Sequence, residues 1–212
     1  MAFTINPKDA ALLVIDMQNG MVHDQGTLAR SGVPMADLQR VVPQVRELVR
    51  LCRSVGIPDI WTMQEHYQRD KSRDAHLIQH HTLRRVNIAC LKGSWDAEIL
   101  DELKAEMTEA SHVIRKQKWS AFYGTNLEIL LRILGRRLLL IAGTTSNLCI
   151  ETTIRDASMR DYDLVIVEDC VAGVRKEWHD AAVATWKYYM GLVIPLDELR
   201  TMLPQPAAAA HE

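Results

Sequence analysis

The chain has 212 residues, of which 48% are hydrophobic and 25% are charged, and its formal net charge is −2. This length suits a single domain whose core is large enough to fold without disulfide bonds. Both signs of charge are interspersed, which excludes the basic surface of a nucleic-acid-binding protein and a polybasic membrane patch. No signal-peptide pattern opens the chain and no apolar run approaches the roughly 18 residues of a membrane span, so we expect a cytoplasmic protein.

Short apolar runs alternate with amphipathic helical patterns along the chain. The apolar runs predict strands at Ala11–Ile15, Asp59–Met63, His112–Arg115, Leu138–Ala142, Leu164–Val167 and Leu192–Ile194. The helical patterns predict helices at Val41–Ser54, Asp96–Ala105, Thr125–Leu134, Asn147–Arg160 and Lys176–Met190. This alternation is typical of a three-layer α/β/α fold around a six-stranded, mainly parallel, Rossmann-like sheet. We expect one domain over residues 1–203 and a flexible tail over residues 204–212.

One polar stretch, from Gln64 to Gly93, shows no clear hydrophobic period. Loops of that length inside a compact domain usually carry function. We therefore interpret it as a lid over a site or as a contact between subunits.

Four candidate residues come after predicted strands: Asp16, Gln64, Lys116 and, beyond a short turn, Cys149. Ligands of open α/β sheets bind outside the carboxyl ends of the strands, so these side chains are expected to meet at one edge. Each has a simpler explanation. Asp16 could cap a loop by accepting local N–H bonds, and Lys116 could belong to a solvated basic turn.

Cys149 stands where a predicted helix begins, after the turn Gly143-Thr144-Thr145-Ser146-Asn147. A helix N-terminus carries unpaired N–H groups and a partial positive charge, which favours a thiolate with a lowered pKa. The same N–H groups could hold a developing oxyanion. The alternative is that Cys149 is a small buried hydrophobic residue, as most free cysteines are.

The other three cysteines show no metal-ligand or disulfide spacing. Cys52 lies on an apolar helix face and is predicted to pack in the core. Cys170 follows Glu168 and Asp169, which makes a low-pKa thiol unfavourable there. Cys90 has no predicted place.

Three ordered motifs resemble the isochorismatase-like cysteine hydrolases, and the likeness covers roughly residues 8–195. The motifs are Ile15-Asp16-Met17-Gln18-Asn19-Gly20, Lys116-Gln117-Lys118-Trp119-Ser120-Ala121-Phe122-Tyr123-Gly124-Thr125 and Gly143-Thr144-Thr145-Ser146-Asn147-Leu148-Cys149. The resemblance implies a catalytic triad of Asp16, Lys116 and Cys149. It also implies a cis peptide bond between Thr144 and Thr145, and an oxyanion hole made by the backbone N–H groups of Thr145 and Cys149.

Differences between this chain and other members of the family narrow the reactions that it is expected to catalyse. Enzymes that hydrolyse a vinyl ether lack the cysteine, so Cys149 implies hydrolysis of a C–N bond. Nicotinamidases carry an Asp-x-His metal site where this chain has Gln64-Glu65-His66, which implies neither a metal nor a cofactor here. Gln64 resembles a substrate-contacting position of ureidoacrylate amidohydrolases, and Lys92-Gly93-Ser94-Trp95-Asp96 resembles a Gly-Thr-Trp-Asp stretch of the same enzymes, which makes Trp95 a pocket candidate. Those enzymes typically have Ser-Gly-Phe where this chain has Ser120-Ala121-Phe122. Tyr123 is a further pocket candidate, and for Tyr123 and Trp119 the alternative is a place in the core.

The sequence thus predicts a cysteine-dependent amidohydrolase that cleaves a small amide or ureido compound through a thioester. Two alternatives stay open: another hydrolysis on the same scaffold, such as that of a vinyl ether, and a non-catalytic oligomeric binding module. The resemblance also implies a homodimer or homotetramer that binds a small molecule rather than nucleic acid or a membrane. Trp178, Trp186, Tyr188 and Tyr189 on the last long helix could form an interface between subunits or pack in the chain's own core.

Overall fold

The computed structural model describes residues 4–68 and 88–204. Six strands form one sheet in the order β3-β2-β1-β4-β5-β6, and each pairing between these strands is parallel. The strands are β1 (Ala10–Ile15), β2 (Asp59–Gln64), β3 (His112–Lys116), β4 (Leu138–Thr144), β5 (Asp163–Ala172) and β6 (Leu192–Ile194). The α-helices are α1 (Asn19–Val22), α2 (Thr27–Arg30), α3 (Ala36–Arg40), α4 (Val42–Ser54), α6 (Leu127–Ile133), α7 (Glu151–Ser158), α8 (Lys176–Tyr189) and α9 (Leu196–Met202).

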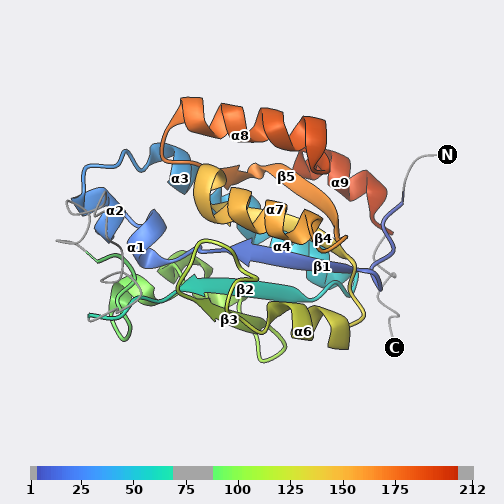
Figure 1. Ribbon diagram of the computed structural model, residues 1–212, viewed down its shortest axis with the longest axis horizontal. Coiled ribbons are helices and arrows are strands. Elements are labelled where there is room, and N and C mark those ends of the chain that lie inside the picture. The colour runs from blue at the N-terminus through green and yellow to red at the C-terminus, as the bar shows by residue number, and fades with distance from the viewer. Residues whose placement is uncertain (1–3, 69–87, 205–212) are drawn as a thin grey trace, which may run out of the picture.

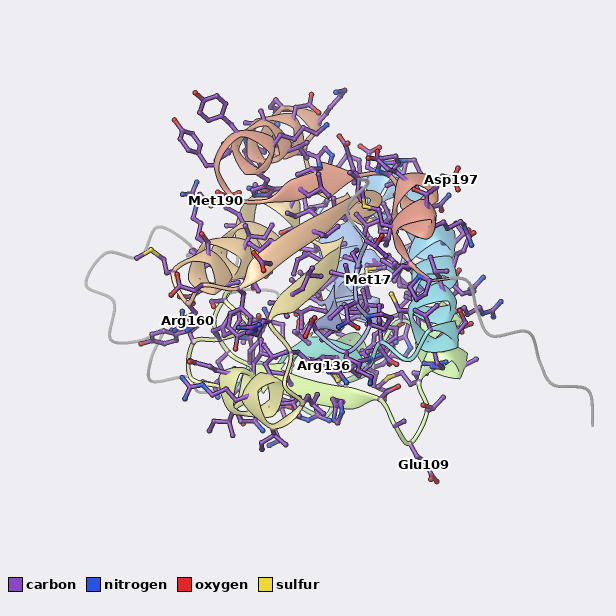
Figure 2. All side chains as sticks on the ribbon, turned by 90° about the vertical axis from the view of Figure 1, so that its right-hand side faces the viewer. Met17, Glu109, Arg136, Arg160, Met190 and Asp197 are labelled. Atoms are coloured by element: carbon purple, nitrogen blue, oxygen red, sulfur yellow. The ribbon has the colours of Figure 1, made fainter. Side chains whose placement is uncertain are left out.

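Helices cover both faces of the sheet. Alternate residues of β1 enter two separate cores, because successive side chains of a strand point to opposite faces. Leu12 and Val14 pack in the core that includes α4 and α9, whereas Leu13 and Ile15 pack in the core that includes α6, α7 and α8. Figure 2 shows the same division, with α4 and α9 on one side of the sheet and α6 and α7 on the other. The predicted three-layer α/β/α fold is confirmed.

The strand order reverses between β1 and β4. From β1 the chain builds outward through β2 to β3, and from β4 it builds outward in the other direction through β5 to β6. Such a switch point opens a crevice at the carboxyl ends of the two central strands, where open α/β sheets bind their ligands. Figure 1 shows the arrowheads of β1 and β2 pointing toward the end of the molecule where α1 and α2 lie.

The predicted helix Asp96–Ala105 is wrong. Two short 3₁₀ helices occupy this region, η2 (Trp95–Ala97) and η3 (Asp101–Glu106). Between them, the N–H of Leu100 donates to the oxygen of Met17 (2.9 Å) and the oxygen of Glu98 accepts from the N–H of Asn19 (3.0 Å). Peptide groups that bond to the chain after β1 cannot form a continuous helical ladder, whatever the local propensity.

The predicted helix Asn147–Arg160 forms in two parts. A single π-helical turn, η4 (Ser146–Ile150), comes first and α7 begins at Glu151. Most of the predicted lid, residues 69–87, and the predicted tail after Pro204 lie outside the described residues. Within the described ranges, no helix is long and apolar enough to cross a membrane.

Gly143 lets β4 approach β1 at the switch point. Its φ is +118°, and a Cβ at this position would lie 2.1 Å from the oxygen of Ile15 and 2.7 Å from its nitrogen. Any larger residue would push β4 away from the neighbouring backbone, which has no freedom to yield because it is a central strand.

We predict that Gly143→Ala lowers the free energy of unfolding by about 2–5 kcal/mol, since backbone strain and overpacking add. Urea denaturation followed by circular dichroism measures this. Gly135→Ala is the matched control, because Gly135 also has a positive φ (+66°) but nothing within 4 Å of its missing Cβ. Its cost should be about 1–2 kcal/mol. Equal costs for the two variants would contradict the importance of the contact with β1.

Candidate active site

Asp16 stands at the switch point, directly after β1. Its φ of +51° turns the chain away from the sheet, and its side chain is fully buried. One carboxylate oxygen, Oδ1, accepts a hydrogen bond from the hydroxyl of Thr62 on β2 (2.6 Å). The other, Oδ2, lies 2.7 Å from the ammonium of Lys116. The carboxylate therefore binds groups from two other strands rather than capping its own loop.

Lys116 is the last residue of β3, paired in register with Gln64. Its Nζ donates to Asp16 Oδ2 (2.7 Å), to Gln64 Oε1 (2.7 Å) and to the oxygen of Lys118 (3.2 Å). Burial lowers the pKa of this amine, but the charge of Asp16 and the thiol of Cys149 more than offset that effect, so the pKa lies above its usual value. Lys116 is thus a buried ammonium ion, and its interpretation as part of a solvated turn is wrong.

Cys149 lies in η4, with 4% of its surface exposed. Burial raises the pKa of its thiol to about 12, Lys116 acts against that rise, and Asp16 adds to it. The charges of Asp16 and Lys116 thus act on the thiol in opposite directions. The expected low pKa is therefore wrong for the resting protein, because the modest effect of a helix terminus, about 0.3–1 kcal/mol, is outweighed by desolvation. At neutral pH, Cys149 is a neutral thiol held between an acceptor and a cation.

The turn that precedes Cys149 has the backbone geometry that the resemblance implied. The peptide bond between Thr144 and Thr145 is cis, as expected. The hydroxyl of Thr144 donates to the backbone oxygen of Asp16 (3.2 Å), which links this turn to the end of β1. The use of the Thr145 and Cys149 N–H groups as an oxyanion hole remains a prediction.

Two threonines that the sequence did not single out support the site. Thr62 holds the Asp16 carboxylate, and it stands out only as a polar residue within an apolar strand. The hydroxyl of Thr153 donates to the oxygen of Cys149 (2.6 Å) and accepts from the N–H of Ala121 (3.0 Å). Thr153 thereby connects the turn that holds Cys149 to the loop that follows Lys116, a contact between segments that no sequence spacing reveals.

The proposed substrate contacts have different surroundings. Gln64 is buried and binds Lys116, as described above. The indole of Trp95 donates to Asp101 Oδ2 (2.8 Å) and packs edge-on against His23. Tyr123 is 66% exposed and Trp119 is 50% exposed, so the alternative that places these two in the core is wrong. Contacts of Gln64, Trp95 and Tyr123 with a substrate stay predictions.

The other three cysteines are also buried. Cys52 packs on α4, as predicted, and burial raises the pKa values of both Cys52 and Cys170. Cys90 has a φ of +54°, and its carbonyl accepts from the N–H of His66 (2.9 Å). In residues 4–68 and 88–204, no three His, Cys, Asp or Glu side chains gather as metal ligands would.

Comparison with known proteins agrees with this geometry. Residues 10–198 match the family model of the isochorismatase domain. The chain is 27% identical to the ureidoacrylate amidohydrolase RutB of Enterobacter sp. (strain 638), with 98% of this chain and 95% of the relative covered. It is 33% identical to an Arabidopsis thaliana protein named "Probable inactive nicotinamidase", with 85% of this chain and 89% of the relative covered. The crystal structure of N-carbamoylsarcosine amidase from Thermoplasma acidophilum superposes with a TM-score of 0.71 at 26% identity, covering 88% of this chain and 96% of that one.

A parallel α/β sheet with a buried acid, ammonium ion and thiol at its switch point, together with these relatives, defines an isochorismatase-like hydrolase. The chain belongs to the isochorismatase family, as the match over residues 10–198 shows.

The raised pKa of Cys149 predicts how the resting thiol reacts with iodoacetamide. Only the thiolate is alkylated, and its fraction rises about tenfold per pH unit below the pKa. With a pKa of about 12, the alkylation rate of Cys149 should keep rising from about pH 7 to about pH 10, without a plateau. Mass spectrometry of the Cys149 peptide measures the rate. A plateau near neutral pH would show that the thiol is already ionised.

Two variants should move this rate in opposite directions at about pH 8. Asp16→Asn removes a charge that raises the thiol pKa, so alkylation should become faster. Lys116→Met removes the charge that lowers the thiol pKa, so alkylation should become slower. A shift of both variants in the same direction would contradict the electrostatic assignment.

Proposed function

We propose that this protein is a cysteine-dependent amidohydrolase that cleaves a C–N bond of a small amide or ureido compound through a thioester. The observation that carries the proposal is the buried pair of Asp16 and Lys116, 2.7 Å apart, whose charges both act on the buried Cys149 thiol. A neutral thiol beside a carboxylate can give up its proton at the moment of attack. The ammonium ion of Lys116 keeps its position and stabilises the negative charge that proton transfer leaves on the Cys149 sulfur.

The first half of the proposed reaction forms the thioester. Asp16 takes the proton of the thiol as sulfur bonds to the carbonyl carbon, and the C=O electron pair moves onto oxygen. The N–H groups of Thr145 and Cys149 would stabilise this oxyanion, a donor of that kind being worth about 2.7–4 kcal/mol. As the C–N bond breaks, Asp16 returns its proton to the departing nitrogen, and ammonia or an amine leaves.

The second half restores the enzyme. Water attacks the thioester carbon, Asp16 accepts a proton from the water, and the C–S bond breaks. The carboxylic acid product leaves and the sulfur recovers its proton from Asp16. Lys116 keeps its proton throughout, because its raised pKa makes it a permanent cation. Its role in this scheme is to hold Asp16 and to stabilise negative charge on sulfur.

The ureido class is favoured over simple amides by two observations. Two relatives are named a ureidoacrylate amidohydrolase and an N-carbamoylsarcosine amidase. In addition, Gln64-Glu65-His66 departs from the Asp-x-His metal motif of the nicotinamidases, and the Glu65 carboxylate is ion-paired with Arg115 (3.0 Å). The Glu65 carboxylate thus already has a cationic partner in Arg115.

We predict ammonia release from a ureido compound and at least about a 10³-fold loss of that activity in Cys149→Ala, as for other nucleophile deletions. The panel should contain ureidoacrylate-like compounds, biuret, N-carbamoyl amino acids and nicotinamide. Ammonia is measured by a coupled assay, and the acyl-enzyme is sought by intact-mass spectrometry after rapid quenching.

Each outcome separates the proposal from its alternatives. Release that depends on Cys149 supports the amidohydrolase. Activity that survives Cys149→Ala indicates another hydrolysis on the same scaffold, such as that of a vinyl ether. No activity from a folded protein whose Cys149 cannot be acylated by any compound of the panel favours a non-catalytic binding module.

A cytoplasmic homodimer or homotetramer remains the expectation for the assembly. Of the aromatic residues of α8, Trp186 is fully buried in the chain's own core, whereas Trp178, Tyr188 and Tyr189 are 42%, 79% and 74% exposed. Sedimentation equilibrium measures the mass of the assembly directly.

A further inference from the structure

The side chain of Gln18 takes the place of a missing stretch of β1. Backbone pairing between β1 and β2 ends where the N–H of Asp16 donates to the oxygen of Thr62 (3.2 Å). Beyond that point the positive φ of Asp16 carries the backbone away from the sheet. The next peptide groups of β2 that face this edge belong to Gln64, two residues after Thr62, because alternate residues of a strand bond to the same neighbour.

Gln18 satisfies both of those peptide groups. Its Oε1 accepts from the N–H of Gln64 (2.8 Å), and its Nε2 donates to the oxygen of Gln64 (2.9 Å). The same Nε2 donates its second hydrogen to the oxygen of Ala97 (2.8 Å). The Gln18 side chain is fully buried, so water cannot replace these bonds. The amide of Gln18 thus acts as one further peptide unit in the ladder.

The position of Gln64 in turn constrains the ammonium group of Lys116. The Gln64 side-chain oxygen accepts from Lys116 Nζ at 2.7 Å, the same distance that separates Nζ from Asp16 Oδ2. A carbonyl acceptor at that point fixes one direction of an otherwise flexible ammonium group. The contacts therefore run from Gln18 through the backbone of Gln64 to Lys116.

We propose that Gln18 is a positioning residue for catalysis: its buried amide replaces a strand backbone, fixes Gln64 at the edge of the sheet and so aims Lys116 at Asp16 and Cys149. This inference rests on the proposed function only for its effect on turnover. The placement of Lys116 relative to the thiol can be tested without any substrate.

The experiment compares Gln18→Met and Gln18→Asn with the unaltered protein. Methionine keeps the length of the side chain and removes the amide, and asparagine keeps the amide but cannot reach both partners. In both variants Lys116 is less well held, so the Cys149 thiol loses part of its stabilising charge. Alkylation of Cys149 at about pH 8 should slow at least about threefold, in the direction of Lys116→Met. On a substrate found with the panel, kcat should fall about tenfold with KM changed less than about twofold.

Asp59→Ala is the matched control. Asp59 is the first residue of β2, the strand that Gln64 ends, and it is also buried. Its carboxylate accepts hydrogen bonds from the indole of Trp61 (2.6 Å) and from Arg53 (3.3 Å). Its loss should lower the melting temperature and leave the alkylation rate of Cys149 unchanged. Slower alkylation in the Gln18 variants alone supports the proposal. An unchanged rate in the Gln18 variants, or the same loss in Asp59→Ala, overturns it. Neither result depends on whether the protein hydrolyses any compound of the panel.

Discussion

The ion pair between Asp16 and Lys116 constrains the whole central part of the sheet. Neither side chain has any exposed surface, and two charges removed from water cost several kcal/mol each unless their remaining hydrogen-bonding groups are satisfied. Thr62, Gln64 and the carbonyl of Lys118 supply those bonds. Because the partners come from the ends of β1, β2 and β3, the three strands must keep one register for the pair to exist.

The same pair shows how a thiol that is protonated at rest could serve as the nucleophile of the proposed reaction. A buried thiolate with only a helix terminus to stabilise it would be unfavourable, and burial accordingly raises the pKa of Cys149. In the proposed reaction, Asp16 accepts the thiol proton, and the ammonium of Lys116 stabilises the sulfur after the proton has moved. The site thus keeps its overall charge constant as the proton moves, which is the arrangement that a low-dielectric crevice favours.

Much of the fold could be predicted from local patterns. The six apolar runs identified all six strands. The central strands β1 and β4 are the most easily recognised, because strands covered on both faces are apolar nearly throughout. The helix predicted at Asp96–Ala105 failed for a reason that no local pattern contains. Its peptide groups bond to Met17 and Asn19, which lie far away in the sequence. Likewise Cys90 could not be placed, since its neighbours are residues brought in by the sheet.

The candidate site residues were already identified by the sequence: an acid, a lysine and a cysteine each come after a predicted strand, and the end of a parallel strand is where a ligand binds. Only the tertiary structure decided their chemical state. The charge of Lys116 and the neutral thiol of Cys149 depend on burial and on charges from other strands, and the support from Gln18, Thr62 and Thr153 depends on contacts between distant segments. The physical reason is that residue type sets which protons a group can exchange, whereas the surroundings set the free energy of each charged form.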